Sequence, residues 1–315
     1  MAHLSVIIPT LNETATLPFL LDALADQTRP PDEIIVADAD SQDATVALAL
    51  ARGVPVVRGG RSGAGRNAGA RAATGDILLF LDADVLPGAE FIERALDEFE
   101  RANYAVATCR LSPLGDRLSD HILADITNRY LQMVQSVSPH APGFCIFCRR
   151  HVHLEIGGFN ETVKLAEDHD YVQRAARCGH FGVLKSVYIP VSMRRVEKEG
   201  LTRLALKYLW CEMYVLTGKP IYTTPFEYEF GAHKPPFVET TRRRWISTPL
   251  PWQLASVLST IGWILPYRNR RWVEPYTNRI SEQRLAEGCQ MPSKKLTDIE
   301  DSCYGLSRSN VRPKP

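Results

Sequence analysis

Two pairs of acidic residues have a spacing that could support chemistry. Asp82 and Asp84 follow directly on five apolar residues, Ile77 to Leu81, in the stretch GDILLFLDADVLPG. If the backbone stays extended past this run, both carboxylates lie on the same side of the chain, where they repel each other unless a cation lies between them. A divalent metal ion is the natural candidate, because hard cations prefer carboxylate oxygens. An isolated LDAD turn can instead be a solvated strand end with a helix cap.

The second pair, Glu167 and Asp168, opens a predicted helix. This helix carries apolar side chains on one face and ends before a glycine: Tyr171, Val172, Ala175, Ala176 and Gly179. Acidic residues are common at a helix N-terminus because they interact favourably with the helix dipole. On its own, therefore, this pair is more often structural than catalytic.

Strand and helix patterns alternate through roughly the first 190 residues and must position both pairs. Apolar runs bounded by turn residues predict strands at LSVII, IIVA, VPVV, ILLFL, YAVAT, PGFCIF and FGVLKSVYI. Helical spacing predicts helices between most of them, including a glycine-rich one from about residue 62 to residue 73. This alternation predicts an α/β fold with a mostly parallel sheet flanked by helices. Ligands bind at the carboxyl edge of such a sheet, where Asp82 ends a strand.

Composition limits the class of protein. With 315 residues and 45% hydrophobic content, the chain can form one large domain with an extension, or two domains. Its 37 basic and 36 acidic side chains nearly cancel, so nucleic acid is not expected as a partner. Seven cysteines without a disulfide framework suit a reducing compartment. The N-terminus lacks a secretory signal pattern, and we expect a cytoplasmic protein.

The pattern changes beyond about Val196, where aromatic-rich helical stretches replace the strand-helix crossovers. We predict a catalytic domain over residues 1–195, a helical extension over 196–292 and a disordered tail over 293–315. Residues 250–265 carry a one-sided apolar stripe with arginines on both flanks, interrupted by polar residues. A membrane span needs about 20 apolar residues, so the stripe favours a helix in the membrane interface. The alternative is a helix packed on the catalytic domain.

Five motifs in order resemble the family 2 glycosyltransferases with a GT-A fold: LSVIIPTLNE, VADADSQDAT, GRNAGARAATGDILLFLDAD, GGFNE and AEDHDYVQRAARCG. Each motif is weak by itself, whereas five at compatible spacing are specific. They cover about the first 195 residues. The resemblance implies a GT-A-like, Rossmann-type sheet with a helical C-terminal extension. It also implies inverting transfer of a sugar from a nucleoside-diphosphate sugar to an acceptor hydroxyl.

The resemblance also implies residue roles. Asp82 and Asp84 would bind Mg²⁺ or Mn²⁺, which bridges the diphosphate and offsets the charge that develops on the leaving group. Asp168, with Glu167 beside it, would be the general base that takes the proton of the acceptor hydroxyl. The donor contacts implied by the family motifs are Pro9, Thr10, Asn12, Glu13, Asp38, Arg66, Asn67 and Asp82.

Three short stretches need a separate interpretation. Many family members carry Asp-Asp-Gly-Ser where this chain has Asp38-Ala39-Asp40-Ser41, so the donor base stays open, and Asp40 can instead cap its own turn. The stretch GAGRNAG misses the G-x-G-x-x-G spacing of a dinucleotide-binding loop. In CIFCRRHVH, Cys145 and Cys148 are three residues apart in a predicted strand and face opposite sides. We therefore interpret these two cysteines as buried and reduced rather than as zinc ligands.

Two other functions remain open from the sequence. One is a nucleotidyltransferase on a related fold, which would release pyrophosphate, and the other is a catalytically inert nucleotide-sugar-binding protein. The acceptor is not specified by the motifs, because its contacts would come from the extension; a lipid, a polyprenyl phosphate and a saccharide are all compatible. We expect a peripheral protein at the cytoplasmic face of a membrane.

Overall fold

The computed structural model describes residues 2–215 and 221–226. The predicted interfacial stripe at 250–265 and the predicted tail at 293–315 lie outside these residues. The division into domains stays a prediction. In the described part the last strand of the sheet ends at Val191 and only helices and short connections follow it, close to the predicted boundary.

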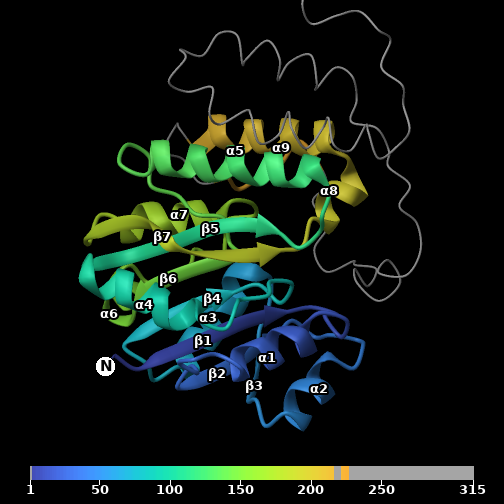
Figure 1. Cartoon of the computed structure of the whole chain (residues 1–315), viewed down its shortest axis with the longest axis vertical. Helices are drawn as coiled ribbons and strands as arrows, with labels where there is room; N and C mark the ends of the chain where they lie inside the picture. Colours follow the sequence, from blue (N-terminus) through green and yellow to red (C-terminus); the bar gives the residue numbers. More distant parts are fainter. Residues whose placement is uncertain (1, 216–220, 227–315) are drawn as a thin grey trace, which may run out of the picture. The chain divides into compact units, whose positions relative to one another are not determined.

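A seven-stranded sheet lies at the centre of the described residues (Figure 1). Its order is β3-β2-β1-β4-β6-β5-β7, and β6 runs antiparallel to both of its neighbours while the other pairs are parallel. The strands are β1 (Leu4–Thr10), β2 (Glu33–Asp38), β3 (Val56–Arg58), β4 (Ile77–Leu81), β5 (Tyr104–Pro113), β6 (Cys145–Arg149) and β7 (His180–Val191). The predicted mostly parallel α/β sheet is therefore confirmed. The apolar runs predicted β6 as a strand but not its reversed direction.

Helices pack on both faces of the sheet and bury two apolar cores. One core includes side chains of α1 (Leu17–Ala25), α2 (Thr45–Ala51) and α4 (Phe91–Arg101). The other includes side chains of α3 (Ser62–Ala72), α6 (Arg150–Glu155) and α7 (Glu167–Ala175). The three remaining helices of the described residues, α5 (Leu118–Val134), α8 (Arg194–Glu199) and α9 (Leu201–Val215), are drawn in the upper coloured part of Figure 1.

Strand β4 shows why a continuous apolar run marks this fold. Its residues alternate between the two cores, with Ile77, Leu79 and Leu81 in one and Leu78 and Phe80 in the other. A strand covered on both faces needs apolar side chains at every position, because successive side chains point to opposite sides. The strand therefore places whatever follows Leu81 at the edge of a rigid, fully buried element.

The chain does not stay extended after β4. Ala83 and Asp84 form a turn, and Ala83 is buried in the same core as Leu81. Asp82 and Asp84 therefore do not lie side by side along an extended strand. The two carboxylates instead reach different partners, as described below.

The two cysteines of β6 lie where the strand period predicted them. Cys145 belongs to one core and Cys148 to the other, and both are buried and free. His153 follows on α6, a short helix that the sequence patterns did not predict, and its ring Nδ1 lies 2.9 Å from the Tyr171 hydroxyl. These contacts give the cysteines and His153 a packing role in the core.

Candidate active site

Four strand ends bring the candidate residues to one edge of the sheet. Thr10 and Asp38 end the neighbouring parallel strands β1 and β2 and are register partners. β4 pairs with the other side of β1 and delivers Asp82 just beyond its last residue. β7 is parallel to β5 and ends three residues before Arg194. The edge predicted to bind ligands therefore carries both acidic and basic side chains.

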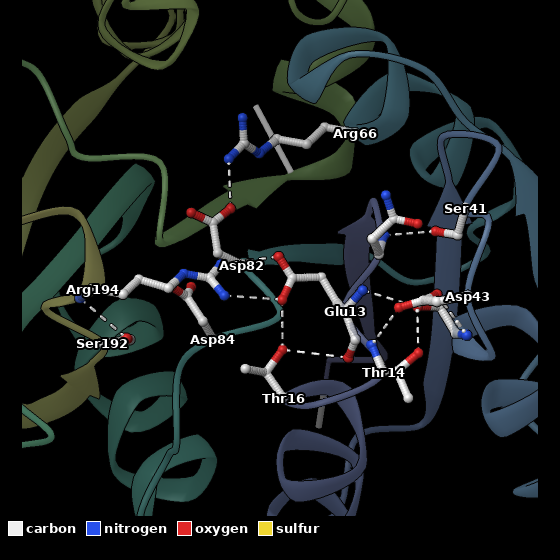
Figure 2. A network of polar contacts seen from close by, with 12 residues as sticks. Glu13, Thr14, Thr16, Ser41, Asp43, Arg66, Asp82, Asp84, Ser192 and Arg194 are labelled. Carbon is white, nitrogen blue, oxygen red and sulfur yellow. Dashed lines mark hydrogen bonds and ion pairs between the residues drawn. The ribbon is translucent and has the colours of Figure 1, made fainter. Parts of the chain in front are cut away.

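Arg66 joins the two acidic pairs. Its Nη2 donates to Asp82 Oδ1 at 2.8 Å (Figure 2). Its Nη1 donates to Glu167 Oε1 at 3.2 Å. The Arg66 side chain is only 3% exposed, and its position on α3 fixes it between β4 and the start of α7. The carboxylates at the end of β4 and at the start of α7, which are 85 residues apart in sequence, thus share one buried cation.

Gly143 allows the close approach of these groups. Its carbonyl oxygen accepts a hydrogen bond from Arg66 Nη2 at 3.0 Å. A Cβ at this position would lie 2.7 Å from Arg66 Nη2 and 3.1 Å from Asp168 Oδ2. The missing side chain therefore leaves space in which Arg66 and Asp168 lie close together, and the two also attract each other electrostatically.

A second arginine, which the sequence did not predict, contacts the acidic pair from the other side. Arg194 Nη1 and Nη2 donate to the two carboxylate oxygens of Glu13, at 3.1 and 2.9 Å. Its Nε lies 3.1 Å from Asp84 Oδ2. Figure 2 shows Asp82 directed toward Arg66 while Asp84 lies beside Arg194. A fork-shaped guanidinium suits such contacts because its donors lie in one plane.

The surroundings of the aspartates disfavour their charge. Desolvation by the surrounding protein, together with repulsion by Asp84, raises the pKa of Asp82 to about 6 against the opposing attraction of Arg66. Desolvation also raises the pKa of Asp84, again against an arginine, Arg194, and with repulsion from Glu13. The ionised forms of both carboxylates remain disfavoured despite the neighbouring arginines. A further cation beside them would therefore stabilise their charge.

Asp168 occupies the first turn of α7. Its Oδ1 accepts the N–H of His169 at 2.9 Å, and its Oδ2 faces the space beside Gly143. His169 Nε2 lies 4.0 Å from Asp168 Oδ1, and the His169 ring lies against the His140 ring with 4.7 Å between centroids. The preceding residue, Ala166, has φ 58°, a left-handed conformation that turns the chain into the helix. Asp168 is thus held at the site by backbone contacts of its own helix.

The loops after β1 and β2 are held together by Asp38. This carboxylate accepts hydrogen bonds from the Thr10 hydroxyl at 2.9 Å and from the Ser41 N–H and hydroxyl at 2.8 and 2.6 Å. Asn12, with φ 57°, accepts the Gln42 N–H and donates its own N–H to Ser41. The predicted donor residues Pro9, Thr10, Asn12, Glu13 and Asp38 therefore lie together. Their contacts with a donor stay a prediction.

Asn67 and Asp40 have structural contacts of their own. Asn67 donates to the Phe159 carbonyl at 2.8 Å and to Glu161, and its oxygen accepts the Phe159 N–H at 2.8 Å. It thereby fixes the GGFNE loop to α3, while its predicted role in donor binding stays untested. Asp40 is exposed, with φ 59°, and pairs with Arg58 at 3.5 Å instead of capping its turn.

The cluster fits a divalent cation. Carboxylates outnumber guanidinium groups here, with Glu13, Asp82, Asp84, Glu167 and Asp168 against Arg66, Arg194 and Arg195. Among residues 2–215 and 221–226, no group of three or more acidic, histidine or cysteine side chains is arranged around one ion. Mg²⁺ is commonly held by one or two carboxylates together with substrate phosphates. Asp82 and Asp84 can supply this partial set of ligands.

The sequence reasoning missed several residues of the site, and the sequence features that could have identified them differ. Arg194 belongs to MRRVEKEG, directly after the last apolar strand, and adjacent arginines past a strand end could have suggested a site residue. For Gly143 the only sequence feature is the glycine itself, because the need for a small residue there comes from the close approach of Arg66, which belongs to another element. His140 and His169 approach each other across 29 residues, and no spacing in the sequence predicts this contact.

Replacing Arg66 tests whether it holds the site together. We expect Arg66→Met to lower the free energy of unfolding by about 3 kcal/mol, because it leaves the carboxylates of Asp82 and Glu167 without their buried partner. Chemical denaturation measures this difference. The matched control is Arg58→Met, since Arg58 and Asp40 are 85% and 73% exposed and such pairs contribute about 0 to 1 kcal/mol. Equal effects of the two substitutions would contradict the role given to Arg66.

This fold, with an acidic pair after its central strand and a second acidic pair beside it, has the arrangement that the motifs predicted for a GT-A glycosyltransferase. The family model described as "Glycosyl transferase family 2" matches residues 5–157, from β1 through α6. The chain is therefore similar to the family 2 glycosyltransferases over this region, as its motifs predicted. The Glu167–Asp168 pair lies beyond the matched residues.

Curated relatives agree with this family. The chain is 29% identical over 180 residues to an uncharacterized glycosyltransferase of Haemophilus influenzae, covering 54% of this chain and 60% of that protein. It is 28% identical over 250 residues to glycosyltransferase AglE of Haloferax volcanii, covering 69% of this chain and 81% of that protein. The match to the Haemophilus protein thus leaves part of each chain unaligned.

Solved structures confirm the predicted GT-A fold. The mannosyltransferase PcManGT from Pyrobaculum calidifontis, solved with GDP-Man and Mn²⁺, superposes with a TM-score of 0.52 at 23% identity, covering 68% of this chain and 62% of that one. S. aureus TarS 1-349, solved with UDP-GlcNAc, has a TM-score of 0.50 at 22% identity, covering 61% and 59%.

Proposed function

We propose that the protein transfers a sugar from a nucleoside-diphosphate sugar to an acceptor hydroxyl, with inversion at the anomeric carbon. The observation that carries this proposal is the shared contact of Arg66 with Asp82 and Glu167, which brings the candidate metal pair to the candidate base pair. Binding of GDP-Man and Mn²⁺ by PcManGT, and of UDP-GlcNAc by TarS, supports a nucleotide-sugar donor and a divalent metal.

Each residue has a defined task in this reaction. Asp168 accepts the proton of the acceptor hydroxyl as the acceptor oxygen bonds to the anomeric carbon, while the bond from that carbon to the diphosphate oxygen breaks and its electrons leave with the diphosphate. A divalent ion bound at Asp82 and Asp84, Mg²⁺ or Mn²⁺, would stabilise the negative charge of this leaving group. Arg66 keeps Asp82 and Glu167 in place during the reaction.

The loops around Asp38 are proposed to hold the nucleoside. Strand ends at this edge of an open α/β sheet form a crevice for nucleotides, and carboxylate or hydroxyl oxygens can accept from ribose hydroxyls or from a base. Asp38 already accepts hydrogen bonds from Thr10 and Ser41. It therefore orders the loop that would contact the nucleoside. The base and the sugar are to be identified by a donor screen.

A product assay tests the proposal. The full chain is incubated with Mn²⁺ and a panel of nucleoside-diphosphate sugars, and the released products are identified. Release of a nucleoside diphosphate, by transfer or by slow hydrolysis, is the expected result. In a parallel incubation with a nucleoside triphosphate and a sugar 1-phosphate, release of pyrophosphate would indicate a nucleotidyltransferase instead. Tight binding of a nucleotide sugar without any turnover would indicate an inert binding protein.

We also propose that the protein acts at the cytoplasmic face of a membrane. Each helix in residues 2–215 and 221–226 is too short or too polar to cross a bilayer. The arginine-flanked stripe at residues 250–265, which motivates the proposal, lies outside the described part of the chain.

A further inference from the structure

Exposed apolar side chains are concentrated on two helices near the site. Fourteen large hydrophobic side chains are exposed in the described part of the chain, and eight of them belong to α5, to α9 or to the turn after α5. Figure 1 draws both helices toward the same end of the sheet. Single exposed apolar residues are normal on a protein surface, whereas a concentration of them marks an interaction site.

On α5 the exposed residues follow one face of the helix. Ile126, Tyr130 and Met133 are spaced by four and three residues, and Val137 follows in the turn after the helix; Met133 and Val137 are 78% and 87% exposed. The opposite face, with Ala124, Asn128 and Leu131, is buried. α5 therefore packs one face against the rest of the protein and still exposes an apolar stripe on the opposite face.

On α9 the arrangement is similar. Leu206, Leu209 and Met213 are exposed at helical spacing, with Tyr208 beside them, while Leu204, Lys207 and Cys211 are buried on the other side. We call the exposed residues of the two helices, Ile126, Tyr130, Met133 and Val137 with Leu206, Tyr208, Leu209 and Met213, the α5–α9 face.

This face is connected to the candidate base by aromatic rings. Tyr130 of α5 lies 5.5 Å from the His140 ring, and His140 lies 4.7 Å from the ring of His169, the residue next to Asp168. On α9, the Tyr208 side chain is half exposed, and the carboxylates of Asp168 and Glu199 lie near its hydroxyl. Asp168 is therefore within reach of both helices.

The most exposed of the described charged side chains on α5, α8 and α9 are basic. Arg129 on α5, Lys198 on α8 and Arg203 on α9 are exposed. Among the described side chains of the same three helices, no acidic residue is equally exposed. Apolar stripes flanked by cations are typical of helices that lie on an anionic bilayer surface, whereas a protein partner would not require this bias.

We infer that the α5–α9 face docks on an anionic lipid bilayer and that the acceptor hydroxyl is carried by a lipid of that bilayer. The inference rests on the proposed function, since it names the acceptor class for the same site. Docking through this face places the membrane surface beside Tyr130 and Tyr208. The head group of a lipid acceptor then enters toward Asp168 while its chains stay in the bilayer.

Flotation of the full chain with vesicles tests the inference without any catalytic step. The parent protein is expected to float with phosphatidylcholine vesicles that contain phosphatidylglycerol, and less with phosphatidylcholine alone. Binding should weaken with salt, with a contribution of about fivefold for each basic residue near the surface. The double variant Met133→Glu, Leu209→Glu is expected to partition about tenfold less, or lower, because it places charge in the apolar stripes.

The matched control is Leu50→Glu, Leu154→Glu, which changes leucines that are 57% and 61% exposed on α2 and α6. It should float like the parent, and circular dichroism should show all variants folded. Equal flotation of the two double variants would overturn the inference, as would a parent that does not float. A parent that is dimeric in solution and becomes monomeric in the Met133→Glu, Leu209→Glu variant would identify a second copy as the occupant and also overturn it. The product assay fails or succeeds independently, because it needs no membrane.

Discussion

Asp84→Asn is expected to lower the rate of sugar transfer strongly and to remove the metal-dependent part of donor binding while the fold stays intact. Removing a charged ligand removes its attraction for the ion, and loss of metal stabilisation of the leaving group costs several kcal/mol, on the order of 10² to 10³ in rate. Calorimetry with a nucleoside diphosphate, with and without Mn²⁺, measures the binding difference. The thermal midpoint should not fall much, because Arg194 keeps two hydrogen bonds to Glu13 and the substitution removes a carboxylate that Glu13 repels.

The matched control for this substitution is Asp40→Asn. Asp40 is an exposed turn aspartate of the same chain, paired only weakly with Arg58 at 3.5 Å. It should leave transfer and Mn²⁺-dependent binding close to those of the parent. If Asp84→Asn retains the full effect of Mn²⁺ on nucleotide binding, Asp84 is not a metal ligand, and its contact with Arg194 would be its main role.

The strands of this protein could be predicted because a buried strand requires a run of apolar residues in the sequence. In β4 every residue from Ile77 to Leu81 lies in one of the two cores. The apolar run in the sequence therefore predicts both the strand and its buried position in the sheet. The same holds for the buried side of α7, where Tyr171, Val172 and Ala175 have the predicted helical spacing. Patterns of this kind depend on local residues alone.

The geometry of the site depends on contacts that local patterns do not contain. Arg194 reaches Glu13 across 181 residues, and the turn at Ala83 and Asp84 separates two carboxylates that an extended strand would have kept together. Arg66 was predicted as a donor contact, yet its guanidinium is engaged by Asp82 and Glu167. Motifs therefore identified most of the residues, and only the structure shows which of them bind one another.

Asp168→Asn separates chemistry from binding. Turnover is expected to fall by about 10² to 10⁴, the usual contribution of a general base, while donor affinity hardly changes. The structure supports Asp168 over its neighbours, because Glu167 is hydrogen-bonded to Arg66 and Asp170 to Arg174, whereas Asp168 Oδ2 faces the space beside Gly143. Asparagine keeps an oxygen that can accept the His169 N–H, so the start of α7 should persist.

The decisive comparison is with Asp170→Asn in the same helical turn. This substitution weakens the Asp170–Arg174 ion pair and should reduce stability, but turnover at saturating donor and acceptor should stay within a few-fold of the parent. Turnover of Asp168→Asn that is equally close to the parent would exclude Asp168 as the base and direct attention to Glu167. Weaker nucleotide binding by Asp168→Asn, measured by calorimetry without acceptor, would instead place this carboxylate on the donor side of the site. Only a loss of turnover with unchanged donor affinity assigns Asp168 to the proton of the acceptor, because the acceptor hydroxyl is the group that must lose a proton as the new bond forms.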